Sequence, residues 1–132
     1  MELKSEKGSK HNSGFVISSH YRQWTTRAYV WQPPTDVYET EEKYVVRMEI
    51  AGMHASEFTI TLEGHTLMIQ GTRGAHAEQC AYHQVEIRSG EFVSVVELPG
   101  AVAGEHVAAE YEDGFLQVIL PKSAPHRVDV DD

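Results

Sequence analysis

The chain has 132 residues, of which 41% are hydrophobic and 23% are charged, so we expect one globular domain with short arms. Its net charge of −9 argues against nucleic acid as the main partner, because a polyanion repels an acidic surface. The single cysteine, Cys80, excludes a disulfide framework within the chain and is typical of a cytoplasmic protein; we also expect neither a membrane span nor a secretory signal.

Residues 1–30 are expected to form a flexible N-terminal arm. Residues 1–14 are polar and bury too little apolar surface to become ordered. Residues 15–31 are rich in apolar and aromatic side chains but follow no clean period of a strand or a helix. They are either a first strand of the core or an arm that contacts sister subunits and other proteins. The candidate contact residues of the arm are Phe15, Val16, Ile17, Tyr21 and Trp24.

Pro33 and Pro34 end this segment, and the sequence that follows predicts short strands separated by turns. Apolar and polar residues alternate in most of these runs, which is typical of strands with one buried face. No helix longer than a turn is expected, so the pattern favours an all-β sandwich or barrel. The expected strands are 37–39, 43–50, 57–63, 66–73, 82–86, 91–98, 107–112 and 115–120.

The last two strands, 107–112 and 115–120, should form a hairpin, because Asp113 and Gly114 between them are typical of a tight turn. Pro121 should end it, since proline has no N–H group for a ladder. This stretch resembles the signature of the small heat-shock protein (α-crystallin) family, bacterial type. The residues that match the signature are Ala109, Gly114, Leu116, Pro121 and Lys122.

Three further segments are similar to motifs of that family, at 31–39, 66–73 and 82–99. The resemblance implies an immunoglobulin-like antiparallel β-sandwich, the α-crystallin domain, over residues 31–122. It implies an ATP-independent holdase chaperone that binds partly unfolded proteins under stress. Its partners would be further copies of the same chain and non-native client proteins. It also favours the interpretation of residues 15–31 as a contact arm.

Residues 123–132 are expected to form an exposed C-terminal extension. Val128 and Val130 are spaced by two, so in an extended chain both lie on the same side. The pair resembles the family's C-terminal I-x-I/V motif, which docks into a groove on a neighbouring subunit. The expected groove lies between edge strands 57–63 and 107–112, and its candidate residues are Phe58, Ile60, Leu62, Val107 and Ala109.

The family's bacterial and plant members also pair a short strand of a long loop with the sheet edge of a partner subunit. The candidate strand here consists of Tyr82, His83, Gln84, Val85 and Glu86. The open alternative is a strand that folds back onto its own sheet. Ser94 and Ile87 stand where the family has arginine, so we carry over no interface salt bridge.

Two other function classes fit the sequence less well. A CS-domain-like monomeric co-chaperone or adaptor would share the sandwich but lack the loop strand and the tail motif. An enzyme or metal protein is disfavoured, because the eight histidines are scattered without metal-ligand spacing and no C-x-x-C motif accompanies them. We therefore expect no catalytic, cofactor or metal site and no ATP hydrolysis.

Overall fold

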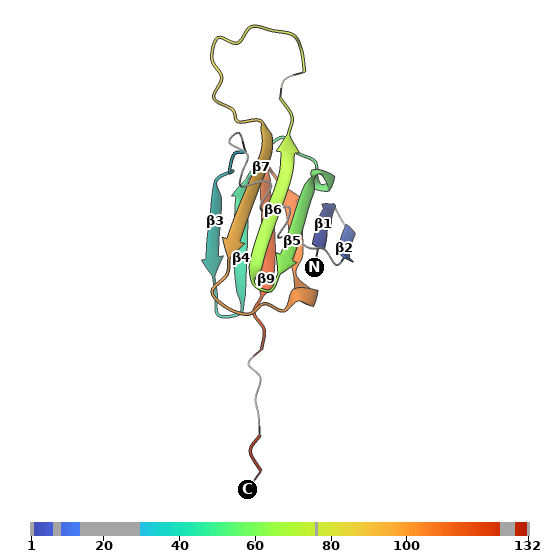
Figure 1. Ribbon diagram of the computed structural model, residues 1–132, viewed down its shortest axis with the longest axis vertical. Coiled ribbons are helices and arrows are strands. Elements are labelled where there is room, and N and C mark those ends of the chain that lie inside the picture. Colours follow the sequence, from blue (N-terminus) through green and yellow to red (C-terminus); the bar gives the residue numbers. More distant parts are fainter. Residues whose placement is uncertain (1, 7–8, 14–29, 76, 125–128, 132) are drawn as a thin grey trace.

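Two antiparallel β-sheets pack face to face in the computed structural model, which describes residues 2–6, 9–13, 30–75, 77–124 and 129–131 (Figure 1). One sheet has the order β2-β1-β5-β6-β7, and the other has the order β3-β4-β9-β8. The helical elements of the described residues are two single 3-10 turns, η1 (Ala55–Glu57) and η2 (Gly104–His106). The predicted all-β sandwich is therefore confirmed.

The strand bounds follow the alternating runs of the sequence closely. The five-stranded sheet contains β1 (Glu2–Glu6), β2 (Ser9–Ser13), β5 (Phe58–Glu63), β6 (Thr66–Arg73) and β7 (Gly90–Glu97). The four-stranded sheet contains β3 (Thr35–Glu39), β4 (Lys43–Glu49), β8 (Ala108–Glu112) and β9 (Phe115–Pro121).

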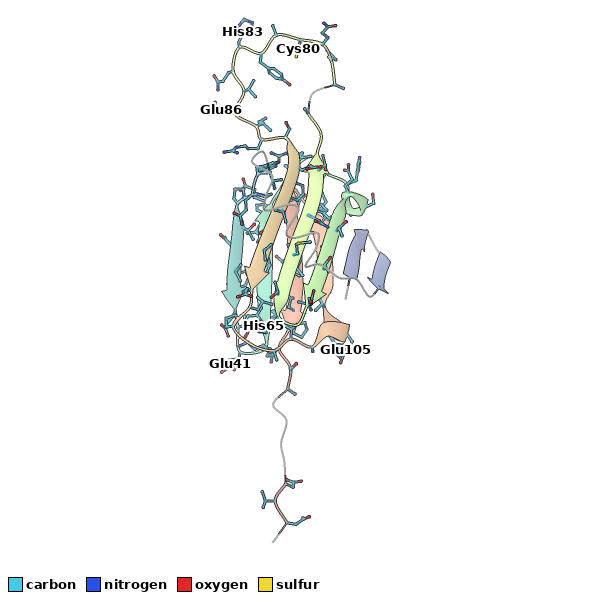
Figure 2. All side chains as sticks on the ribbon, in the orientation of Figure 1. Glu41, His65, Cys80, His83, Glu86 and Glu105 are labelled. Atoms are coloured by element: carbon cyan, nitrogen blue, oxygen red, sulfur yellow. The ribbon has the colours of Figure 1, made fainter. Side chains whose placement is uncertain are left out.

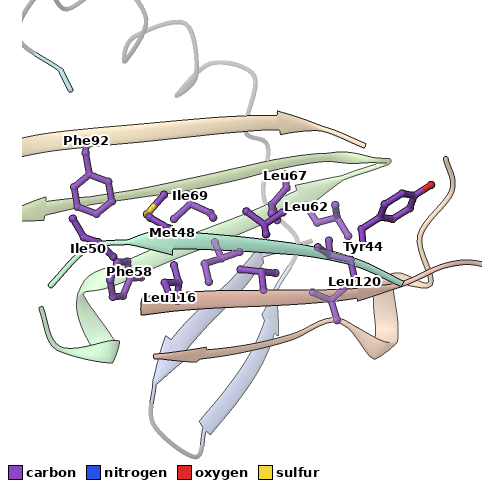
Figure 3. Close-up of a cluster of buried hydrophobic side chains, with 14 of the residues drawn as sticks. Tyr44, Met48, Ile50, Phe58, Leu62, Leu67, Ile69, Phe92, Leu116 and Leu120 are labelled. Atoms are coloured by element: carbon purple, nitrogen blue, oxygen red, sulfur yellow. The ribbon is translucent and has the colours of Figure 1, made fainter. Parts of the chain in front are cut away.

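The core lies between the two sheets and is built by the apolar members of the alternating strands (Figure 3). Met48 of β4, Ile60 of β5 and Leu116 of β9 are fully buried, and their polar neighbours in the strands face outward. Burial of each such side chain contributes about 1.5–3 kcal/mol relative to exposure. The two-residue period of the sequence therefore determines which residues face the core.

Gly71 occupies a position on β6 that no larger residue fits. A Cβ atom there would lie 2.8 Å from Cζ of Phe92 and 2.9 Å from the carbonyl oxygen of Glu57. The buried Phe92 ring fills the space that a side chain would need. This close approach is the physical reason for a glycine in the motif that ends with Arg73.

The turn between β8 and β9 uses two consecutive residues with positive φ, Asp113 at 52° and Gly114 at 82°. Two such residues match the twist of an antiparallel hairpin. The backbone N–H of Ile50 donates to the carbonyl oxygen of Gly114 at 2.8 Å, so the turn also fixes the segment that follows β4. The predicted hairpin is confirmed.

Residues 2–6 and 9–13 carry backbone pairing that the polar composition of residues 1–14 does not predict. They form the antiparallel pair β1 and β2, and β1 pairs with β5 from Glu2 opposite Thr61 to Ser5 opposite Phe58. The expectation rested on apolar burial alone. Backbone N–H and C=O groups at a sheet edge can pair with any extended segment, whatever its composition.

The outer face of the five-stranded sheet is less polar than the alternation predicts. Thr61, Met68 and Gln70 point away from the core, yet they are buried, and Val93 and Val95 beside them are half-buried. Thr61 Oγ1 and Gln70 Oε1 have no hydrogen-bond partner among the described residues. This face is therefore less exposed than the outer face of a strand with one buried side, which the alternation predicts.

Candidate assembly surfaces

A clamp of aromatic and guanidinium groups closes the base of the long loop between β6 and β7. Arg73, the last residue of β6, donates from Nε and Nη2 to the carbonyl oxygen of Arg88 at 2.9 and 2.6 Å. Its Nη1 donates to the carbonyl oxygen of Ala51 at 3.3 Å. Arg73 Cζ lies 4.7 Å from the centroid of the Trp31 ring. The two ends of the loop are thus joined through one side chain.

Trp31 is itself anchored on the free side of β7. Its backbone N–H donates to Glu91 O at 3.1 Å, and its carbonyl accepts from the N–H of Val93 at 3.2 Å. The indole Nε1 donates to Gly90 O at 3.2 Å, and the ring contacts Phe92 edge to face with centroids 5.8 Å apart. Residues from the three motif segments 31–39, 66–73 and 82–99 therefore meet at the base of the loop.

The loop itself extends away from the sandwich, and Cys80, His83 and Glu86 lie along its outer part (Figure 2). Residues 82–86 pair with no strand among the described residues of the chain. Among the described residues this segment therefore does not fold back onto its own sheet. Its described neighbours from 77 to 89 are also exposed, and the apolar Tyr82, Val85 and Ile87 are more than half exposed.

The edge strand β3 is exposed on both of its faces. In the part of the chain that the structure describes, β3 pairs with β4 alone, so one row of its backbone groups faces outward. The neighbouring residues Val37 and Tyr38 point to opposite faces and are 46% and 49% exposed. Sequence reasoning predicted this strand but did not identify it as a contact surface; the two large apolar residues on its opposite faces were the available signal.

The expected groove between β5 and β8 is closed in this chain. Phe58, Ile60, Leu62 and Val107 are buried in the core, and Ala109 packs against them. Strand 57–63 is not an edge, contrary to expectation, because β1 pairs along it and also approaches β8. The five predicted groove residues are thus brought together, but β1 takes the strand edge beside them.

Tyr111, which sequence reasoning missed as a site residue, joins the two sheets beside this groove. Its ring lies 5.1 Å from that of Phe58, centroid to centroid. Its hydroxyl donates to the carbonyl oxygen of Ile50 at 2.8 Å and accepts from the N–H of Met53 at 3.2 Å. Its place in the β8 alternation was the signal that could have identified it.

The tail leaves the sandwich at the end opposite the long loop (Figure 1). Val130 is 84% exposed, which gives it the free apolar surface that docking requires. Val128 lies outside the described residues. So do Phe15, Val16, Ile17, Tyr21 and Trp24, the candidate contact residues of the arm.

Lys122, the last signature residue, connects the end of β9 to β3. Its Nζ lies 2.6 Å from the Glu39 carboxylate and 5.2 Å from the centroid of the Tyr44 ring. The hydrogen bond to Glu39 raises the pKa of Lys122 above its usual value, although partial desolvation acts in the opposite direction. Lys122 therefore holds β3, the exposed edge, against the body of the domain.

The other signature residues act in the fold. Ala109 packs beside the core, Leu116 is buried in it, and Gly114 forms the hairpin turn. Pro121 ends β9, and its carbonyl accepts from the N–H of Ala103 at 2.8 Å. The signature thus marks a folding motif whose last residue, Lys122, connects β9 to the edge strand β3.

Comparison with known proteins places this geometry in a family. The profile described as "Hsp20/alpha crystallin family" matches residues 36–131, well over half of the chain. The chain belongs to this family. Its members are small heat-shock proteins, which are chaperones rather than enzymes.

Three relatives illustrate the range of these small heat-shock proteins. The 18.1 kDa class I heat shock protein of Oryza sativa subsp. japonica is 34% identical over 70% of this chain and 59% of its own length. Small heat shock protein C4 of Rickettsia felis is 29% identical over 83% of this chain and 66% of its own length. The matches thus span less than two thirds of these relatives. The structure of HSP18.5 from E. histolytica has a TM-score of 0.65 and 22% identity, covering 78% of this chain and 100% of that one.

Similarity in sequence therefore extends to plant and bacterial proteins, and similarity in fold extends to a protist protein, so the comparisons do not single out the bacterial type. In the parts of the chain that the structure describes, no group of three or more His, Cys, Asp or Glu side chains could hold a metal ion. No helical segment there has the length and apolar character that crossing a membrane requires.

Proposed function

We propose that this chain is an ATP-independent holdase that keeps partly unfolded proteins from aggregating. Its subunits exchange the 82–86 strand within a dimer, as in bacterial and plant members of the family. Dimers then join through the Val128 and Val130 tail. The supporting observation is the distribution of exposed apolar side chains. In the described residues the large ones are Val37, Tyr38, Tyr82, Val85, Ile87 and Val130, and all lie on β3, the loop or the tail.

The proposed dimer contact joins β3 to residues 82–86, two segments with backbone groups that have no strand partner in the described residues. Among the described residues, β3 has a row of backbone groups that no strand pairs with, and the 82–86 segment pairs with no strand. Adding a strand to a sheet edge satisfies both sets of groups and protects the edge from aggregation. Ile87 directly follows this segment and would lie on the same side of the added chain as Val85, because their spacing is two. Apolar burial replaces the arginine contacts that Ser94 and Ile87 do not supply.

The tail contact is weak by itself, which suits a reversible assembly. Burial of each valine contributes about 1.5–3 kcal/mol, and the loss of freedom on binding offsets much of that. Many tails on one assembly act together through their high effective concentration. A subunit can therefore detach and expose apolar surface to a client without energy from ATP.

The strand exchange is tested by Gln84→Pro, with Gln84→Thr as the matched control. Proline removes one N–H donor from the middle of the proposed strand, whereas threonine retains it and favours strands. Native mass should show monomers for the proline variant and dimers or larger species for the control. Equal masses for the two variants would contradict the exchange.

Chaperone activity is tested by light scattering of a heat-denatured client without ATP. The native chain should suppress aggregation, and Gln84→Pro should suppress it less. A chain that is monomeric and inactive in this assay would fit the CS-domain-like adaptor instead. We also propose a cytoplasmic location, supported by the exposed, unbridged Cys80.

A further inference from the structure

The N-terminal hairpin, β1 with β2, occupies the sheet edge at which the tail groove was expected. β1 runs antiparallel to β5, with Leu3 opposite Ile60 and Ser5 opposite Phe58. β6 takes the other edge of β5, so this is the one edge that β5 could offer to an incoming segment. The paired part of β5 carries two of the predicted groove residues, Phe58 and Ile60.

β1 also reaches toward the second sheet, because it approaches β8 and η1 as well as β5. The groove expected for the tail is bounded by the same two strands, β5 and β8. A segment that pairs with one and approaches the other lies across the opening between them. The hairpin and a docked tail therefore cannot occupy this position together.

We infer that the hairpin is a detachable plug of the β5–β8 groove, which competes with the Val128–Val130 tail of a neighbouring subunit. The inference rests on the tail docking of the proposed function. In the closed state β1 covers β5, and the polar strand β2 becomes the outer edge of the sheet. In the open state the hairpin leaves β5, and the tail takes its place. Assembly is thereby coupled to release of the subunit's own N-terminus.

The composition of the hairpin suits a plug that detaches easily. The sequences of its two strands are ELKSE and SKHNS, in which Leu3 is the only large apolar residue. Two-stranded ribbons without an apolar face are marginally stable. Backbone pairing with β5 must therefore supply most of the free energy that keeps the hairpin in place. The tail brings two valines spaced by two and can bury more apolar surface in the same place. A high local concentration of tails should therefore displace the hairpin.

The test uses full-length chains whose own tails cannot dock, because they carry Val128→Ser and Val130→Ser. One also carries Lys4→Pro and Ser5→Pro; the matched control carries Lys4→Thr and Ser5→Thr. Consecutive N–H groups of a strand point to opposite edges, so the proline pair removes one donor toward β5 and one toward β2. A labelled peptide of residues 123–132 is titrated into each chain, and its fluorescence anisotropy is measured.

The peptide should bind the proline chain about tenfold more tightly, as expected if the hairpin covers the groove for about nine tenths of the time in the control. Equal affinity for the two chains would overturn the plug while leaving tail docking intact. No binding to either chain would overturn both. A peptide with both valines replaced by serine should bind neither.

Hydrogen exchange gives a second readout that needs no proline. In the chain with an unaltered hairpin, a saturating amount of peptide should speed amide exchange in residues 2–6, because the plug leaves β5. Unchanged exchange in 2–6 while the peptide is bound would also overturn the inference.

Discussion

Arg73 and Trp31, far apart in the sequence, stack with the guanidinium carbon 4.7 Å from the ring centroid, and Arg73 also holds the far end of the loop through Arg88 O. The loop that carries the proposed exchange strand therefore starts from a fixed base. A flexible strand on a fixed base loses less freedom when it pairs with a partner, so this contact should favour the dimer.

The first prediction concerns this clamp. Arg73→Ala should lower the free energy of unfolding by about 1–2 kcal/mol, because it removes hydrogen bonds made by a charged group. It should also weaken the dimer. Arg73→Lys retains the charge but cannot form the same fork, so it should fall between the alanine variant and the native chain. Denaturant unfolding and dimer dissociation check this; an alanine variant equal to the native chain in both would contradict it.

The second prediction concerns packing at Gly71. Gly71→Ala should destabilise the domain by about 1–3 kcal/mol, since the added Cβ would be forced against the Phe92 ring and the Glu57 carbonyl. Gly74→Ala is the matched control, because a Cβ at Gly74 would meet no atom within 4 Å. Unfolding midpoints measured in urea should differ clearly between the two variants, and matching midpoints would refute the account of the motif.

The third prediction concerns pH. The pKa of Lys122 is raised in the folded protein above 10.5, mainly by its hydrogen bond to Glu39. A raised lysine pKa contributes stability that is fully present below 10.5 and is lost as pH rises through the folded pKa. The native chain should therefore be more stable than Glu39→Gln below this range, and the difference should shrink above it. Thermal unfolding across the range checks this; a difference that grows with pH would contradict it.

The fourth prediction concerns the tail. Val128→Ile with Val130→Ile adds one methylene at each site, or about 0.8 kcal/mol per residue if both are buried. Subunit exchange, followed by energy transfer between two labelled populations, should become severalfold slower. Isoleucines placed instead at Asp129 and Asp131 serve as the control, because this spacing presents the opposite side of the extended tail. Exchange that is faster in the Val128→Ile/Val130→Ile variant than in the native chain would contradict tail docking.

The strands of the sandwich were predictable because their residues alternate between core and surface, as Ile60 and Leu116 show. The turn at Asp113 and Gly114 was also predictable from local sequence, because few residue types other than glycine, asparagine and aspartate adopt positive φ angles. The exposure of Val130 also agrees with the interpretation of the tail as a free segment.

Features set by distant pairing were not predictable from local pattern. β1 and β2 have polar sequences. They form strands because β1 pairs through its backbone with the edge of β5 and β2 pairs with β1. The contact between Arg73 and Trp31 needs the folded sheet to bring the two residues together. The burial of Thr61 and Gln70 on the outer face also depends on the surroundings of the sheet, which alternation does not encode.

The most direct test of assembly through the tail is the native mass of the full chain beside that of the Val128→Ser/Val130→Ser variant. The account predicts a large assembly for the native chain and dimers for the variant, because the strand exchange survives when tail docking is lost. An unchanged large assembly would remove the tail from the mechanism. Monomers in both cases would contradict the central claim that the exposed apolar residues of β3, the loop and the tail are assembly surfaces.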